Sequence, residues 1–260
     1  MPVLAVTGPS GCGKTSLAKA LAGRLALEGW RATLLHQDDY FITARRPGHS
    51  YWDWLAPDGD ALRADAEQKE SPEALDMDAL CAVIERSPRD ELVILEGYLL
   101  LQHARLMRSV DAVLYLYAQM HVCLARRLAR SERTARETEG CRRYYVHAVW
   151  PGYERHTLPH LIARIGQPGA AAPPQQTPPP PMAVLDATDA ADESAVLVQA
   201  LRALGAALPT MTDATAAAVR TLSLMHHVSS CGWGAIADVA PAYLEQMRDS
   251  PPTRARLGAA

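Results

Sequence analysis

Short apolar runs alternate along the chain with segments in which apolar residues recur every three or four positions. The runs bounded by turn residues predict buried strands over 3–7, 32–36, 92–95, 112–117 and 183–185. Helical spacing predicts helices over 14–28, 76–85, 120–131 and 193–208. Strands that alternate with helices indicate βαβ units. The predicted fold class is therefore α/β, with three α/β/α layers around a parallel sheet of about five strands.

Three segments depart from this alternation. Residues 54–70 are charged and lack a period, so we interpret them as an insertion. Residues 166–181 are rich in Pro, Gln and Ala and cannot bury a core, which predicts a disordered loop. We expect one domain over 1–208 and a helical C-terminal extension over 209–260. A protein partner of the Pro-rich loop or of the extension is one hypothesis.

Composition excludes several classes of function. The 260 residues carry 26 Lys and Arg against 29 Asp and Glu, a net charge of −3. This balance argues against a protein that coats nucleic acid or anionic membranes through bulk charge. No apolar run approaches the roughly 18 residues of a membrane span, and the first residues lack the features of a signal peptide. Five widely spaced cysteines without a CxxC pair favour a reducing, cytoplasmic location.

A phosphate-binding loop is the strongest motif. GPSGCGKT at 8–15 matches GxxxxGK[ST] and lies between a predicted strand and a predicted helix. Backbone N–H groups of such a loop surround phosphate oxygens, the lysine reaches the β- and γ-phosphates, and the hydroxyl of the last residue ligates Mg²⁺. ATP and Mg²⁺ are therefore the predicted cofactors, bound by Gly8, Ser10, Gly11, Cys12, Gly13, Lys14, Thr15 and Ser16. The loop alone is shared by kinases, GTPases and motor ATPases, but the base-reading motif typical of GTPases is missing from the sequence.

Acidic residues follow two of the predicted strands. Asp38 comes just after the second strand and Glu96 just after the third. Ligands of open parallel sheets collect beyond the carboxyl ends of the strands. Asp38 is thus placed to take the proton of an attacking hydroxyl, whereas the adjacent Asp39 is the weaker candidate. Glu96 is placed to hold Mg²⁺ together with Thr15. The alternative is that these acids cap turns.

Arginines gather on one predicted helix. Arg126 and Arg130 are four residues apart and share a helix face, with Arg127 beside them. The plain interpretation is a solvated charged surface. The functional one is a lid in which Arg126 and Arg130 cover a transferring phosphoryl group.

Four blocks resemble the nicotinamide riboside kinases, which belong to the uridine-kinase-like P-loop kinases. They are GPSGCGKTSLAKAL (8–21), HQDDYF (36–41), LVILEGYLLL (92–101) and YYVHAVWPGYERH (144–156). The resemblance implies a P-loop NTPase fold and a general-base role for Asp38. It also implies that Asp53 holds the ribose hydroxyls, that Trp52 stacks on the nicotinamide, and that Arg127 touches the riboside. It places Thr188 near the adenine.

The resemblance implies a reaction as well. The expected activity is transfer of the γ-phosphoryl group of ATP to the 5′-hydroxyl of nicotinamide riboside, or of nicotinic acid riboside, in NAD salvage. Two alternatives stay open. One is a kinase for uridine or another small molecule, and the other is a nucleotide-binding regulatory protein without catalysis.

Overall fold

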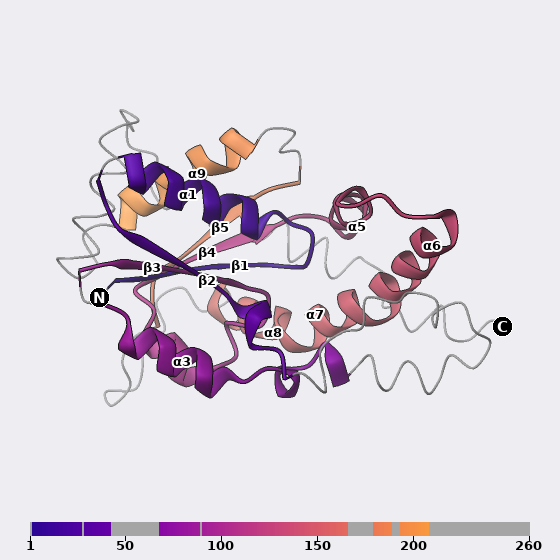
Figure 1. The fold of residues 1–260 in the computed structure, drawn as a ribbon, viewed down its shortest axis with the longest axis horizontal. Helices are drawn as coiled ribbons and strands as arrows, with labels where there is room; N and C mark the ends of the chain where they lie inside the picture. Colours follow the sequence, from indigo (N-terminus) through magenta and orange to yellow (C-terminus); the bar gives the residue numbers. More distant parts are fainter. Residues whose placement is uncertain are drawn as a thin grey trace.

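Five parallel strands form one sheet in the computed structural model, which describes residues 2–27, 29–42, 68–88, 90–165, 179–188 and 193–207. The strands are β1 (Val3–Thr7), β2 (Ala32–His36), β3 (Leu92–Gly97), β4 (Ala112–Tyr117) and β5 (Met182–Asp186). Their order across the sheet is β2-β3-β1-β4-β5, and every neighbouring pair is parallel. All five carboxyl ends therefore meet at one edge, which Figure 1 shows beside α5.

Helices cover both faces of the sheet. They are α1 (Lys14–Leu27), α3 (Met77–Arg86), α4 (Ala104–Arg108), α5 (Met120–Ala129), α6 (Ala135–Tyr144), α7 (Trp150–His156), α8 (Leu158–Ile165) and α9 (Glu193–Ala207). Figure 1 shows α1 and α9 on one face and α3 and α8 on the other, with α5 and α6 extending beyond the sheet. The arrangement is the predicted three-layer α/β/α fold.

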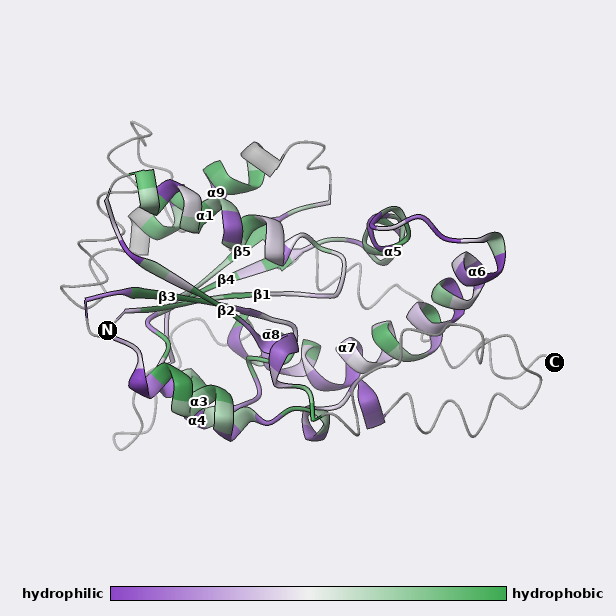
Figure 2. Cartoon of the chain, viewed as in Figure 1, coloured by the Kyte–Doolittle hydropathy of each residue, from purple (hydrophilic) through white to green (hydrophobic). Residues whose placement is uncertain are grey.

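Alternation along the strands divides the apolar core in two. Leu4 and Val6 of β1 pack in the cluster that contains Leu21 of α1. Val3 and Ala5, which point the other way, pack in the cluster that contains α3 and α8. A strand buried on both faces needs apolar residues at every position. This requirement explains the continuous apolar runs in the sequence and the green interior of Figure 2.

One long helical segment runs from α6 through a π-helical turn, Tyr145–Val149, into α7. It begins with a capping box, in which the Thr134 hydroxyl accepts from the Glu137 N–H (3.3 Å) and the Glu137 carboxylate accepts from the Thr134 N–H (2.9 Å). Turns of the π type inside helices often occur at functional sites. Here the turn begins at the second of two consecutive tyrosines, Tyr144 and Tyr145, whose hydroxyls bind different parts of the molecule.

Within the described residues, the predicted strands and helices are all present, with ends that shift by one or two residues. β3 extends two residues further than predicted, so that Glu96 lies within the strand. The helices between 135 and 165 were not predicted. Trp52, Asp53, residues 166–178 of the Pro-rich loop and the C-terminal extension lie outside the described residues. Within the described ranges, no helix has the length and apolar character needed to cross a membrane.

Candidate functional site

The loop between β1 and α1 has the geometry of a phosphate cradle. Gly11 adopts a φ of 95°, and a Cβ at this position would lie 2.3 Å from the backbone oxygen of Cys123. Gly8 adopts a φ of 143°, and its Cβ would lie 2.2 Å from the Leu116 oxygen. Glycine is therefore required at both positions, by conformation and by space. The loop leads directly into the N-terminus of α1, whose first N–H groups attract anions.

Polar side chains from three elements meet beside this loop. Lys14 is buried, and its Nζ donates to the Pro9 carbonyl at 2.9 Å. Thr15 Oγ1 donates to Glu96 Oε1 at 3.0 Å, which joins α1 to the end of β3. His36 Nδ1 lies 2.8 Å from the same Glu96 oxygen. The predicted neighbours Lys14, Thr15 and Glu96 are thus brought together, and His36 is an additional member that the sequence did not single out.

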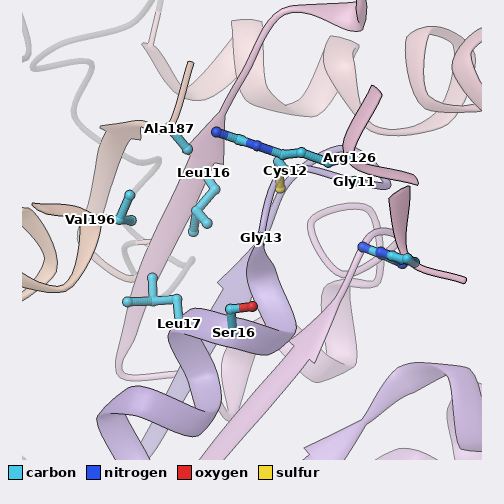
Figure 3. Close-up of a pocket in the computed structure, with 10 residues that line it drawn as sticks. Gly11, Cys12, Gly13, Ser16, Leu17, Leu116, Arg126, Ala187 and Val196 are labelled. Carbon is cyan, nitrogen blue, oxygen red and sulfur yellow. The ribbon is translucent and has the colours of Figure 1, made fainter. Parts of the chain in front are cut away.

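A cavity of about 320 Å³ opens beside the loop. Leu17, Leu116, Ala187 and Val196 give it apolar walls, and Arg126 and Arg130 line it as well. Figure 3 shows Arg126 extending across the cavity from α5, with Leu17 and Leu116 below it. Thr188 follows Ala187 at the end of β5, and its N–H binds Asp186 Oδ1 at 2.8 Å. An apolar pocket beside two guanidinium groups suits a flat ring attached to a polyanion.

Asp38 lies in the 3-10 turn Gln37–Tyr40 that follows β2. Although much of Asp38 is solvent-exposed, the surrounding protein displaces water and raises the pKa of its carboxyl group. The positive charge of Lys14 opposes this rise, and the negative charge of Glu96 adds to it. Asp38 therefore shares one electrostatic environment with the loop lysine and the strand-end acid, as predicted from the strand ends.

A buried carboxylate lies near Asp38. Glu70 is 6% exposed and accepts a hydrogen bond from the Tyr144 hydroxyl. Burial raises the pKa of Glu70, whereas the bond from Tyr144 and the charge of Arg127 lower it. Burial and the negative charge of Glu70 raise the pKa of the neighbouring Tyr98. We call Glu70, Tyr98, Tyr144 and Arg127 the Glu70 cluster. Glu70 is the last residue of the segment interpreted as an insertion, and no role was predicted for it from the sequence.

A glycine makes room for Glu70. A Cβ on Gly152 of α7 would lie 2.9 Å from the Cβ of Glu70. The small residue in WPGYERH therefore lets the chain at Glu70 approach α7. The Pro-Gly pair at 151–152 is the sequence signal that could have indicated a close contact.

Arg127 and Tyr145 hold the phosphate loop from the side of α5 and α6. The Arg127 guanidinium donates to Ser10 Oγ at 2.8 Å and lies 6.0 and 5.8 Å from the ring centres of Tyr144 and Tyr145. The Tyr145 hydroxyl donates to the Ser10 carbonyl at 2.8 Å. Arg127, which the resemblance assigns to the riboside, therefore contacts the phosphate loop, whereas Arg126 and Arg130 line the cavity.

Gln37 fixes the backbone between Asp38 and β3. Its buried Oε1 accepts from the N–H groups of Tyr98 (3.0 Å) and Leu99 (2.9 Å), and its Nε2 donates to the Leu99 carbonyl at 2.7 Å. Gly97 packs against this amide, since a Cβ there would lie 2.5 Å from Gln37 Oε1 and 2.6 Å from Gln37 Cβ. The turn that carries Asp38 is thus held in place by the closely packed side chain of Gln37.

Replacing Gly97 with alanine should destabilise the protein. The added methyl group must displace Gln37 and break its bonds to Tyr98 and Leu99, with an expected loss of about 1–3 kcal/mol in the free energy of unfolding. Urea denaturation measures this loss. The matched control is Gly23→Ala in α1, where a Cβ meets nothing within 4 Å. The control should gain about 0.5–1 kcal/mol from helix propensity. Equal effects at both positions would contradict the role given to Gln37.

Comparisons with solved structures find kinases at low identity. A "putative fructose transport system kinase" from Silicibacter sp. TM1040 shares 18% identity over 70% of this chain and 89% of that one, with a TM-score of 0.43. A "possible uridine kinase" from Bacillus stearothermophilus shares 15% over 63% and 84%, with a TM-score of 0.41. A gluconokinase from Sinorhizobium meliloti 1021 shares 15% over 86% and 94%, with a TM-score of 0.38.

No curated protein sequence matches the chain. A family model described as an AAA domain does match, over residues 4–145. The matched region runs from β1 to the end of α6 and includes the phosphate loop, Asp38, Glu96 and the arginines of α5. It covers more than half of the 260 residues, so the chain belongs to the AAA domain family.

Proposed function

We propose that the protein is a small-molecule kinase that transfers the γ-phosphoryl group of ATP to the 5′-hydroxyl of nicotinamide riboside. One observation carries the kinase assignment. The charge of Lys14 lowers the pKa of Asp38, and the charge of Asp38 raises the pKa of Glu70, so Asp38 lies close to both groups. A carboxylate close to a phosphate cradle and to a second polar cluster is suited to receive a proton from an acceptor hydroxyl.

The residues beside the loop fit ATP with Mg²⁺. The cavity next to the loop accommodates the adenine and ribose, with Arg126 and Arg130 near the phosphates. The Thr15 hydroxyl and the Glu96 carboxylate are hard oxygen donors of the kind Mg²⁺ prefers. Within the described residues no three His, Cys, Asp or Glu side chains form a metal cluster. This suits an ion that keeps several waters and phosphate oxygens. When bound, Mg²⁺ supplies positive charge that offsets charge on the phosphates.

The reaction requires one proton transfer. The acceptor oxygen forms a bond to the γ-phosphorus while the bond between that phosphorus and the β,γ-bridging oxygen breaks, and ADP leaves. Asp38 accepts the hydroxyl proton during this transfer. Lys14 and the lid arginines stabilise the negative charge on the phosphoryl oxygens. Gln37 holds the turn that carries Asp38 in place.

The Glu70 cluster is our candidate for acceptor binding. A buried carboxylate beside tyrosine hydroxyls and a guanidinium suits an acceptor with several hydroxyl groups, such as a ribose. The choice of nicotinamide riboside rests on the resemblance of HQDDYF and YYVHAVWPGYERH. The proposed contacts of Trp52 and Asp53 with the riboside belong to this part of the proposal. Glu70 joins them as a third acceptor-binding residue.

An assay of ADP release with Mg-ATP tests the proposal. Nicotinamide riboside, nicotinic acid riboside and uridine are compared in parallel, with an acceptor-free reaction as background. Turnover of a pyridine riboside supports the assignment. Turnover of uridine alone would keep the kinase and overturn the pyridine riboside. ADP release that ignores every acceptor would indicate an ATPase, and nucleotide binding without turnover would indicate a regulatory protein.

Replacing Tyr145 with phenylalanine should weaken nucleotide binding. The change removes the hydrogen bond to the Ser10 carbonyl and keeps the ring next to Arg127. One hydrogen bond of this kind corresponds to about a 3–10-fold increase in the Kd for ADP. Isothermal titration calorimetry measures that Kd. The control is Tyr153→Phe, which removes a buried hydroxyl bonded to Tyr115 at 2.7 Å and should leave the Kd unchanged.

A further inference from the structure

We propose that His36 is a positioning residue that orients the Glu96 carboxylate for the divalent metal. This inference rests on the proposed function of the loop, but not on any particular acceptor. His36 is the last residue of β2, and it lies opposite Glu96 in the parallel register of β2 and β3. Side chains at paired positions of neighbouring strands point to the same face. The sheet therefore places the imidazole beside the carboxylate before any ligand binds.

The contact itself is well defined. His36 Nδ1 lies 2.8 Å from Glu96 Oε1. Because an ionised carboxylate only accepts hydrogen bonds, the imidazole carries a proton on Nδ1. The Glu96 side chain is 9% exposed, so water contributes little to holding it in place. A buried carboxylate of this kind depends on protein donors for its orientation.

Two donors act on the same oxygen. Thr15 Oγ1 donates to Glu96 Oε1 at 3.0 Å from α1, and His36 donates from β2. Because the Thr15 hydroxyl donates its proton to Glu96 in this hydrogen bond, the lone pairs of Thr15 Oγ1 remain available for a cation. With His36 on the other side, the carboxylate is fixed by two elements of the fold. Without His36, the Thr15 bond alone would hold the carboxylate.

The expected consequence is a loss of metal affinity. Residues that hold metal ligands by hydrogen bonds contribute about 10–100-fold to metal affinity. We therefore expect removal of the Nδ1 donor to weaken divalent binding by that factor. Binding of ADP without metal should not change, because within the described residues His36 is bonded to Glu96 and not to the phosphate loop. A loss of metal affinity without a loss of ADP affinity therefore distinguishes a role in orienting Glu96 from general damage to the site.

Three variants test the inference. His36→Leu removes the donor, His36→Asn keeps an N–H close to the position of Nδ1, and His36→Gln moves the amide further out. His160→Leu on the exposed surface of α8 is the control. Mn²⁺ binding to each ADP-bound protein is measured by electron paramagnetic resonance, and metal-free ADP binding by calorimetry. Neither measurement needs an acceptor, so failure here is distinct from failure of the kinase assignment.

The outcomes are separable. We expect His36→Leu and His36→Gln to bind Mn²⁺ about 10–100-fold more weakly, and His36→Asn and His160→Leu to bind it as the unmodified protein does. Metal-free ADP affinity should be the same in all five proteins. Unchanged Mn²⁺ affinity in His36→Gln would overturn the inference. An equal loss of metal-free ADP affinity would overturn it too, because His36 would then support the loop rather than Glu96. Because His36→Gln keeps a polar side chain, it still tests the inference if His36→Leu fails to fold.

Discussion

Replacing Asp38 with asparagine should lower kcat for phosphoryl transfer by ~10²–10⁴-fold, the range that a general base contributes. Asparagine has nearly the same shape but cannot accept the proton. The Kd for ATP should change little, because in the part of the chain that the structure describes Asp38 makes no hydrogen bond with the phosphate loop. Steady-state ADP release and calorimetric ATP binding, measured on the same preparation, check both parts of this expectation.

Asp39 provides the matched control. It lies next to Asp38 in the same 3-10 turn and is solvent-exposed. Asp39→Asn removes one negative charge without removing the proposed base, so kcat should stay close to that of the unmodified protein. If Asp39→Asn were the inactive variant, the base would be Asp39. If neither variant lost activity, the site would not use an aspartate of this turn.

The pH dependence gives an independent check. The ionised form of Asp38 is the active base, and its raised pKa moves the acid limb of kcat/KM above the pH at which an ordinary aspartate titrates. Asp39 contributes to this rise through its negative charge. Removing that charge in Asp39→Asn should therefore lower the pKa of Asp38 and shift the acid limb to lower pH. A shift in the opposite direction would show that a different group controls the limb.

The central strands β1, β3 and β4 could be predicted from sequence because nearly all of their residues are buried. Runs such as VLAVT in β1 and AVLYLY in β4 contain no charged residue. The helix α6 was harder to predict from the sequence. The segment Ala135–Tyr144 is polar, and it forms a helix that extends beyond the sheet. Its only sequence signal is the capping box Thr134-Ala135-Arg136-Glu137, a local motif that periodicity does not detect.

The candidate site also contains residues that the sequence predicts and residues that it does not. Glu96 lies at the carboxyl end of β3, and Asp38 and Lys14 lie in the segments that follow β2 and β1, so the topology of a parallel sheet predicts that they meet. Glu70 comes from a segment without a pattern and reaches the site only because Gly152 leaves space for it. His36 was visible in the sequence, but its role depends on the register of β2 against β3. Contacts of this kind are set by tertiary structure rather than by spacing.

Replacing Glu70 with glutamine should raise the KM for the acceptor and lower kcat/KM by about 10–100-fold, as expected when a hydrogen bond to a charged group is lost. Glutamine keeps the size of the side chain and an oxygen that can accept from Tyr144. The KM for ATP should stay the same, because Glu70 has no bond with the phosphate loop among those described. Exposed Glu73→Gln, three residues further along, removes the same negative charge outside the Glu70 cluster and is the comparison variant.

An acceptor without one ribose hydroxyl tests what Glu70 binds. If Glu70 holds a ribose hydroxyl, the unmodified protein should prefer a riboside to its 2′- or 3′-deoxy form, and Glu70→Gln should lose most of this preference. Glu70→Gln and removal of the ribose hydroxyl should then lower kcat/KM by the same factor, whether they are made singly or together. In a double-mutant cycle this result indicates one shared interaction. Fully additive losses would contradict the contact. Glu70 would then act through Tyr144 and Arg127. In that case Tyr144→Phe should reproduce the effect of Glu70→Gln, because it removes the hydrogen bond between Tyr144 and Glu70.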